Sequence, residues 1–147
     1  MKPSKHVAIS LGVSLVFWFW TRHFQATVAC FLSGIFIDLD HHLDYWLVKK
    51  EIPWNYKKLV EFCTGLTQKP IYLFFHAYEW LTVLWLTIWW LKLDVIWIGL
   101  AVGLTSHLVC DQFANPLKPF TYFLTYRIIN KFERRKLFDE NYRGKVF

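Results

Sequence analysis

Four apolar stretches separated by polar segments dominate the sequence: Val7–Trp20, Phe24–Ile37, Ile71–Leu91 and Leu93–Cys110. None alternates polar and apolar residues with the period of two that half-buried strands show, so the pattern predicts helices. The third stretch, of about twenty residues, is long enough to cross a bilayer alone. The first two, of roughly fourteen residues and about 21 Å each, cross only if their helices extend into polar flanks or the membrane thins around them.

The links between these stretches differ in length. Thr21–His23 joins the first two stretches and Lys92–Asp94 the last two, so each pair is predicted to form a tight helical hairpin. A long polar loop, about residues 45–70, separates the hairpins. From residue 117 the chain is basic and aromatic, which is typical of a helix in the membrane interface. We therefore expect an all-α integral membrane protein: four short transmembrane helices form a bundle at 1–116, and a tail at 117–147 holds an interfacial, amphipathic C-terminal helix.

Composition supports a membrane protein and its orientation. Hydrophobic residues make up 55% of the chain, and 9 Trp and 14 Phe exceed what a soluble chain of 147 residues could bury. With four crossings, fifteen of the 17 Lys and Arg residues share the side of both termini, and only Arg22 and Lys92 lie opposite. This distribution predicts a multi-pass protein of the inner (plasma) membrane with both termini in the cytoplasm. The net charge of +6 could suggest nucleic acid, but the basic tail is more simply interpreted as a contact with anionic lipid, so we expect membrane lipids as partners and not nucleic acid.

Acidic and histidine side chains are predicted to gather in one layer at the cytoplasmic ends of the four helices. They open the first helix, close the second, occupy the first turns of the third and end the fourth. The residues are His6, Asp38, Asp40, His41, His42, Asp44, His76, Glu79, His107 and Asp111. His76 and Glu79 are three positions apart, and His107 and Asp111 are four apart, so each pair is expected on one helix face.

We interpret this layer as a metal site, because carboxylates packed so closely near lipid repel one another unless a cation intervenes. Imidazole and carboxylate donors without thiolates suit Zn²⁺ best, with Mn²⁺ or Fe²⁺ as alternatives, and their number suggests two or three divalent ions. The predicted ligands are His6, Asp38, Asp40, His41, His76, Glu79, His107 and Asp111. Other readings stay open: His6 as a helix-start residue, Asp44 as an N-cap, and either His41 or His42 as a surface residue.

At these residues the chain resembles the YdjM-type family of inner-membrane metal-dependent hydrolases. The resemblance rests on His6 with Gly12, on Gly34–His41 as a small-x-x-x-Asp-x-Asp-His motif, on His76, and on Ser106–Asp111 as Ser-His-x-x-x-Asp. It implies a hydrolase that depends on a metal, and it covers most of the chain to residue 116. The chain departs from the family's His-Arg-x-x-Thr-His-Ser run, where it has only His76 followed by Glu79, a candidate substitute for the missing imidazole.

The leading functional prediction is a hydrolase at the cytoplasmic membrane face that acts on a phosphoester of a lipid or lipid-linked substrate. Clustered cations would polarise the phosphoryl oxygens, and Asp38, Glu79 or His42 would serve as the general base or acid. A metal-ion transport or binding protein is one alternative, although residues 82–90 and 96–103 supply almost no polar path across the membrane. An oxygen-activating diiron membrane enzyme is another, although the HxxxH and HxxHH boxes of membrane desaturases are absent. A purely structural membrane protein is the third.

Overall fold

The computed structural model describes residues 3–64, 70–115 and 117–138. The prediction of an all-α fold is confirmed: these residues form helices and no strand, apart from one isolated bridge between Leu117 and Phe138. The chain divides into two compact units. The first unit is Met1–Ile37 with Tyr78–Ala114, and the second unit is Asp38–Ala77 with Asn115–Phe147. Each is described by itself.

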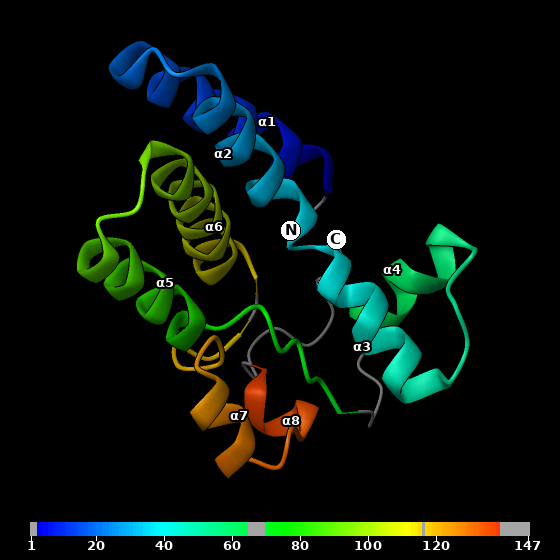
Figure 1. The fold of residues 1–147 in the computed structure, drawn as a ribbon. Coiled ribbons are helices and arrows are strands. Elements are labelled where there is room, and N and C mark those ends of the chain that lie inside the picture. The colour runs from blue at the N-terminus through cyan, green and yellow to red at the C-terminus, as the bar shows by residue number, and fades with distance from the viewer. Residues whose placement is uncertain (1–2, 65–69, 116, 139–147) are drawn as a thin grey trace. The chain divides into compact units, whose positions relative to one another are not determined.

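The first unit consists of four helices, α1 (Pro3–Thr21), α2 (Phe24–Phe36), α5 (Tyr78–Leu91) and α6 (Val95–Ala114). In this unit α2 packs against both α1 and α6, and α5 packs against α6 (Figure 1). Among the described helices, α6 alone combines the length and the hydropathy of a membrane span. The helices of the predicted bundle are therefore present, and the crossing of a membrane by all four stays a prediction.

Two tight turns separate the helices of the first unit at the predicted positions. Arg22 and Lys92 adopt left-handed backbone conformations, with φ of 54° and 52°, which end α1 and α5. The following helices are capped by side chains: His23 Nδ1 accepts a hydrogen bond from Ala26 N at 3.3 Å, and Asp94 Oδ1 accepts one from Ile96 N at 3.0 Å. Both hairpins are thus encoded locally.

Small residues allow α2 and α6 to approach closely. We call them the small-residue seam: Ala26, Cys30 and Gly34 on α2, and Gly99 and Gly103 on α6, all buried. Within each helix they are four positions apart, so they line one face. A Cβ atom on Gly99 would lie 2.1 Å from the carbonyl oxygen of Ala26, and one on Gly103 would lie 2.1 Å from that of Cys30. Only glycine permits such a close contact. Many helices in membranes associate through small residues in the same way.

The second unit contains shorter helices and loops. Its helices are α3 (Leu39–Lys49), α4 (Tyr56–Thr64), α7 (Leu124–Ile129) and α8 (Arg134–Leu137). Tyr45 packs with Leu59 and Phe62 in one core cluster, and Leu137 packs with Ile71 and Leu73 in another. Residues from both parts of this unit therefore share its core.

Two predictions about residues 38–70 need correction. The Asp- and His-rich motif does not close the second helix: α2 ends at Phe36, and Asp38 is the N-cap of α3. The expected polar loop also includes helical segments, because α3 continues to Lys49 and α4 begins at Tyr56. Asn55 Oδ1 accepts a hydrogen bond from Lys57 N at 2.9 Å, which starts α4 where the sequence shows mainly polar residues.

The third apolar stretch forms a shorter helix than predicted, because α5 begins at Tyr78 and has 14 residues. The residues before it use their backbone N–H groups for other bonds. Tyr72 N donates to Asp44 Oδ1 at 2.9 Å, and Phe75 N donates to Asp40 Oδ2 at 2.8 Å. Side-chain acceptors on α3 thus replace the helical hydrogen bonds that residues 71–77 would otherwise make.

The prediction of one amphipathic helix in the tail is wrong for residues 117–138, which form α7 and α8 instead. Lys131 and Phe132 have φ of 54° and 55°, so the chain turns between the two helices. Arg127 and Arg134 are only 1% and 3% exposed, which an interfacial helix with outward basic residues would not show. Residues 139–147 lie outside the described part of the chain.

Candidate metal centre

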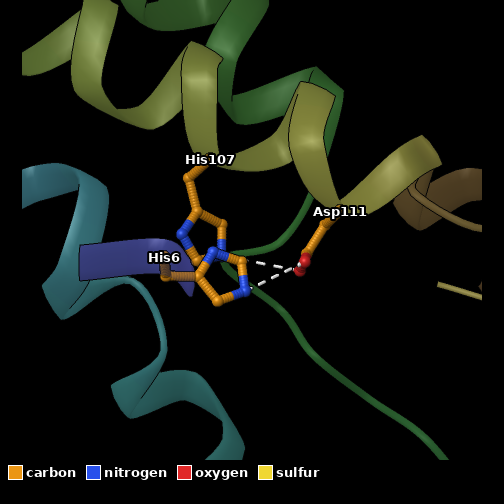
Figure 2. Close-up of side chains that lie close together, drawn as sticks. All are labelled: His6, His107 and Asp111. Carbon is orange, nitrogen blue, oxygen red and sulfur yellow. Dashed lines mark ion pairs between the residues drawn. The ribbon is translucent and has the colours of Figure 1, made fainter. Parts of the chain in front are cut away.

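Two imidazoles and one carboxylate meet in the first unit, and we call His6, His107 and Asp111 the triad. His6 lies near the start of α1, and the other two lie one turn apart on α6. His6 Nε2 is 3.1 Å from Asp111 Oδ1, and His107 Nε2 is 3.5 Å from Asp111 Oδ2 (Figure 2). The imidazole rings stack with centroids 4.1 Å apart. All three side chains are buried, so the sequence gathers ionisable groups away from solvent.

The small-residue seam positions the ring of His107. Its Nδ1 lies 2.8 Å from the carbonyl oxygen of Gly34. Because a carbonyl oxygen only accepts hydrogen bonds, Nδ1 carries a proton, and Nε2 lies on the side of Asp111. Gly103 lies one turn before His107, so close contact along the seam delivers this ring to Gly34. A Cβ atom on Gly34 would lie 2.6 Å from Ser10 Oγ, so α1 is also held close.

The triad has the spacing of a metal site. One donor atom from each residue lies within 4.8 Å of the other two, so the group could hold an ion. Two ligands about 2.1 Å from a tetrahedral metal are about 3.4 Å apart, close to the observed separations of 3.1 and 3.5 Å. Three protein ligands leave a fourth position open, as in catalytic zinc sites. The same donors, two His and one carboxylate, also suit Fe²⁺.

A second group, which we call the Asp38 cluster, lies in the second unit and contains Asp38, Asp40, His41 and His76. Asp38 Oδ1 is 3.7 Å from His41 Nε2 and 3.8 Å from His76 Nε2. His76 and Asp40 are buried, while Asp38 and His41 are half-buried. The cluster thus places the Asp38 carboxylate beside two imidazoles.

Asp40 orients the ring of His76. Its Oδ2 atom accepts hydrogen bonds from Phe75 N at 2.8 Å and His76 N at 3.1 Å, and lies 3.1 Å from His76 Nδ1. Burial alone would raise the pKa of Asp40, but the contacts with His76 and the two N–H groups outweigh it and lower the pKa below the usual value. The ionised carboxylate therefore holds Nδ1–H, and His76 directs Nε2 to Asp38.

Two further ionisable groups adjoin the Asp38 cluster. Burial raises the pKa of Asp44 to about 6, although Tyr72 N donates a hydrogen bond to this carboxylate. Burial also raises the pKa of Cys63 to about 12, so its thiol stays protonated at neutral pH. The Cys63 Sγ atom lies 3.6 Å from His41 Nδ1. This thiol therefore contacts the imidazole of His41.

No protein-family model, curated protein or solved structure matches this chain. The resemblance to the YdjM-type family stays a prediction. The two groups of ionisable side chains are therefore the basis for inferring a function.

The structure brings all predicted metal ligands except Glu79 into one of these two groups. His6, His107 and Asp111 meet in the triad, and Asp38, Asp40, His41 and His76 meet in the Asp38 cluster. The predicted pairing of His76 with Glu79 on one helix face is wrong, because His76 precedes α5. Glu79 is half-buried in the first turn of α5, and His42 is exposed on α3. The expectation of one shared layer stays a prediction.

Some residues that shape the triad were not among those predicted from the sequence. Gly99 and Gly103 continue at the same four-residue spacing into His107 and Asp111, and this regular series was visible in the sequence. The carbonyl of Gly34 had no such signal, because backbone acceptors carry no sequence signature.

Proposed function

We propose that this protein is a membrane-embedded, metal-dependent hydrolase whose substrate is a phosphoester of a lipid or a lipid-linked compound. The triad carries the proposal. His6, His107 and Asp111 are buried, lie at ligand spacing, and include one imidazole whose orientation is set by the Gly34 carbonyl. Metal-ligating histidines usually donate their other ring N–H to a carboxylate or a backbone carbonyl, as His107 does to Gly34.

The chemistry follows from the ligand set. A divalent ion in the triad, Zn²⁺ in our proposal, would supply a Lewis acid for a phosphoryl oxygen and acidify water. His6, His107 and Asp111 would hold the ion, and the Asp111 carboxylate would offset part of its charge. Asp38, His41 and His76 offer a second set of ligands in the second unit, which is our reason to expect a second ion.

Exposed apolar side chains support the membrane part of the proposal. On α1, Val16, Phe19 and Trp20 are 71%, 65% and 78% exposed, and on α5, Trp89 and Trp90 are 73% and 77% exposed. Aromatic and aliphatic surface of this extent is costly in water and favourable in lipid or at its interface. With the apolar helix α6 and the bias of basic residues, it favours a multi-pass inner-membrane protein with a cytoplasmic site.

An oxygen-activating iron enzyme is a second candidate, because two His and one carboxylate are also the ligands of non-haem iron oxygenases. The hydrolase is preferred because the sequence lacks the HxxxH and HxxHH boxes of membrane desaturases and hydroxylases. Iron in the purified protein with substrate-dependent oxygen consumption would favour the oxygenase.

The test is metal content measured by elemental mass spectrometry on detergent-purified protein, followed by a phosphoester screen with the ion that is found. We expect bound Zn²⁺, loss of about one equivalent in His107→Ala, and no loss in His42→Ala, a matched control with an exposed imidazole outside both groups. Lipid phosphoester cleavage should disappear in His107→Ala. A wild-type protein without metal, or metal-replete protein without phosphoester cleavage, would overturn the proposal.

A further inference from the structure

Two arginines of the C-terminal segment are buried in the second unit. Arg127, on α7, donates from Nη1 to the carbonyl oxygen of Leu73 at 2.6 Å and from Nη2 to that of His76 at 2.9 Å. Arg134, on α8, donates from Nη1 to the carbonyl oxygen of Phe62 at 3.0 Å and from Nη2 to that of Cys63. Each guanidinium therefore binds two backbone carbonyl groups of a distant segment.

This arrangement is costly and specific. Burying a guanidinium requires its donors to be used, and the planar fork of arginine can bind two carbonyl oxygens at once. Burial lowers the pKa of Arg134, although the nearby carboxylate of Asp44 acts to raise it. Leu73 has a φ of 42°, a left-handed conformation that a leucine adopts only when its surroundings hold it there. The bond from Arg127 to the Leu73 carbonyl supplies that constraint.

Each arginine acts beside one imidazole of the Asp38 cluster. The Leu73–His76 segment held by Arg127 donates two backbone N–H groups to Asp40 and carries the ring of His76. The Phe62–Cys63 segment held by Arg134 carries the thiol that lies 3.6 Å from His41 Nδ1. Both imidazoles lie beside Asp38.

We propose that Arg127 and Arg134 are positioning residues that hold His76 and His41 in place for ligation at the Asp38 cluster. The C-terminal segment is thus a part of this site's framework in addition to any contact it makes with lipid. Only one part of this proposal depends on the proposed function, namely that the Asp38 cluster binds an ion. The position of the two imidazoles can be tested without metal.

Labelling of histidines with diethyl pyrocarbonate, measured by mass spectrometry on the full chain in detergent, tests the arginine that holds His76. His76 is 0% exposed in the wild type, so we expect slow labelling. Arg127→Met should raise the rate at His76 about tenfold or more, because the rate follows the population of locally opened protein. Arg127→Lys should raise it similarly, because an ammonium group cannot bind both carbonyls as the fork does.

Three internal comparisons make the result interpretable. His42 is exposed and should be labelled rapidly in every variant, and His107 is buried in the first unit and should stay protected. Arg135→Met, which removes an exposed charge next to Arg134, should leave His76 protected. If Arg127→Met also raises the labelling rate of His107, the substitution has disturbed more than the second unit. The labelling rate of His76 in Arg127→Lys then decides whether Arg127 positions His76. A rate at His76 unchanged from wild type, or full protection in Arg127→Lys, would overturn the positioning role.

Metal titration adds a separate readout. In Arg127→Met and Arg134→Met we expect the affinity of one ion to fall by about 10- to 100-fold, while the ion that depends on His107 is retained. Wild-type protein that binds no ion would contradict the proposed function, and the labelling result would still decide the role of Arg127. Two ions bound with unchanged affinity in both variants would contradict the role in ligation.

Discussion

Replacing Gly103 with alanine should separate α2 from α6 and weaken metal binding at the triad. The added Cβ atom would lie 2.1 Å from the Cys30 carbonyl oxygen, whereas ordinary contact begins at 3.4 Å. The helices would therefore have to move apart by about 1.3 Å at this point, since a backbone carbonyl cannot rotate away as a side chain can.

This displacement acts one helical turn from the metal ligands. The hydrogen bond from His107 Nδ1 to the Gly34 carbonyl measures 2.8 Å, and a shift of about 1.3 Å would stretch it to about 4.1 Å, beyond hydrogen-bond range. Loss of such an orienting bond typically lowers metal affinity by about 10- to 100-fold, which corresponds to about 1.4 to 2.7 kcal/mol. We expect the metal affinity of Gly103→Ala to be about 10- to 100-fold lower than that of the wild type.

The assay is competition with a chelator of known affinity on detergent-purified protein, with thermal unfolding measured in parallel. Gly12→Ala is the matched control, because a Cβ atom at Gly12 meets nothing within 4 Å and alanine favours the helix by about 1 kcal/mol. Wild-type metal affinity in Gly103→Ala, with the variant folded, would refute the claim that the small-residue seam positions His107.

Three other substitutions test the electrostatics and packing, each by thermal unfolding in detergent. Burial raises the pKa of Asp44 to about 6, so ionisation costs stability as the pH rises from about 4 through about 6. Asp44→Asn should remove this decline and gain on the order of 3 kcal/mol at alkaline pH; a parallel pH profile would contradict it. Ser33→Ala, which removes the 2.9 Å bond from Ser33 Oγ to the Leu100 carbonyl, should cost about 0.5–1.5 kcal/mol. Phe62→Ala should cost about 3–5 kcal/mol, because Phe62 is buried against Tyr45; a loss below about 1 kcal/mol would show that the cluster is not a core.

The helices of the first unit were predictable because their signals are local. Apolar runs define α1, α2 and α6, and the polar residues at 21–23 and 92–94 mark the turns that left-handed Arg22 and Lys92 complete. The candidate ligands were predictable by type, because carboxylates and imidazoles are rare beside apolar helices. His107 and Asp111 also share a face by spacing alone, and the structure keeps them there.

The second unit shows what spacing along the chain cannot reveal. Residues 71–77 are as apolar as the helix that follows. However, Asp40 and Asp44 accept hydrogen bonds from N–H groups of this segment, and Arg127 donates hydrogen bonds to two of its carbonyls. These competitors lie about thirty to fifty positions away in the sequence, so no local window contains both partners. The same contacts that prevent a helix at His76 also orient its ring. The failure of the helical prediction at His76 and its position in the Asp38 cluster therefore have one cause: the chain gives up regular hydrogen bonds where it fixes the imidazole of His76 beside Asp38.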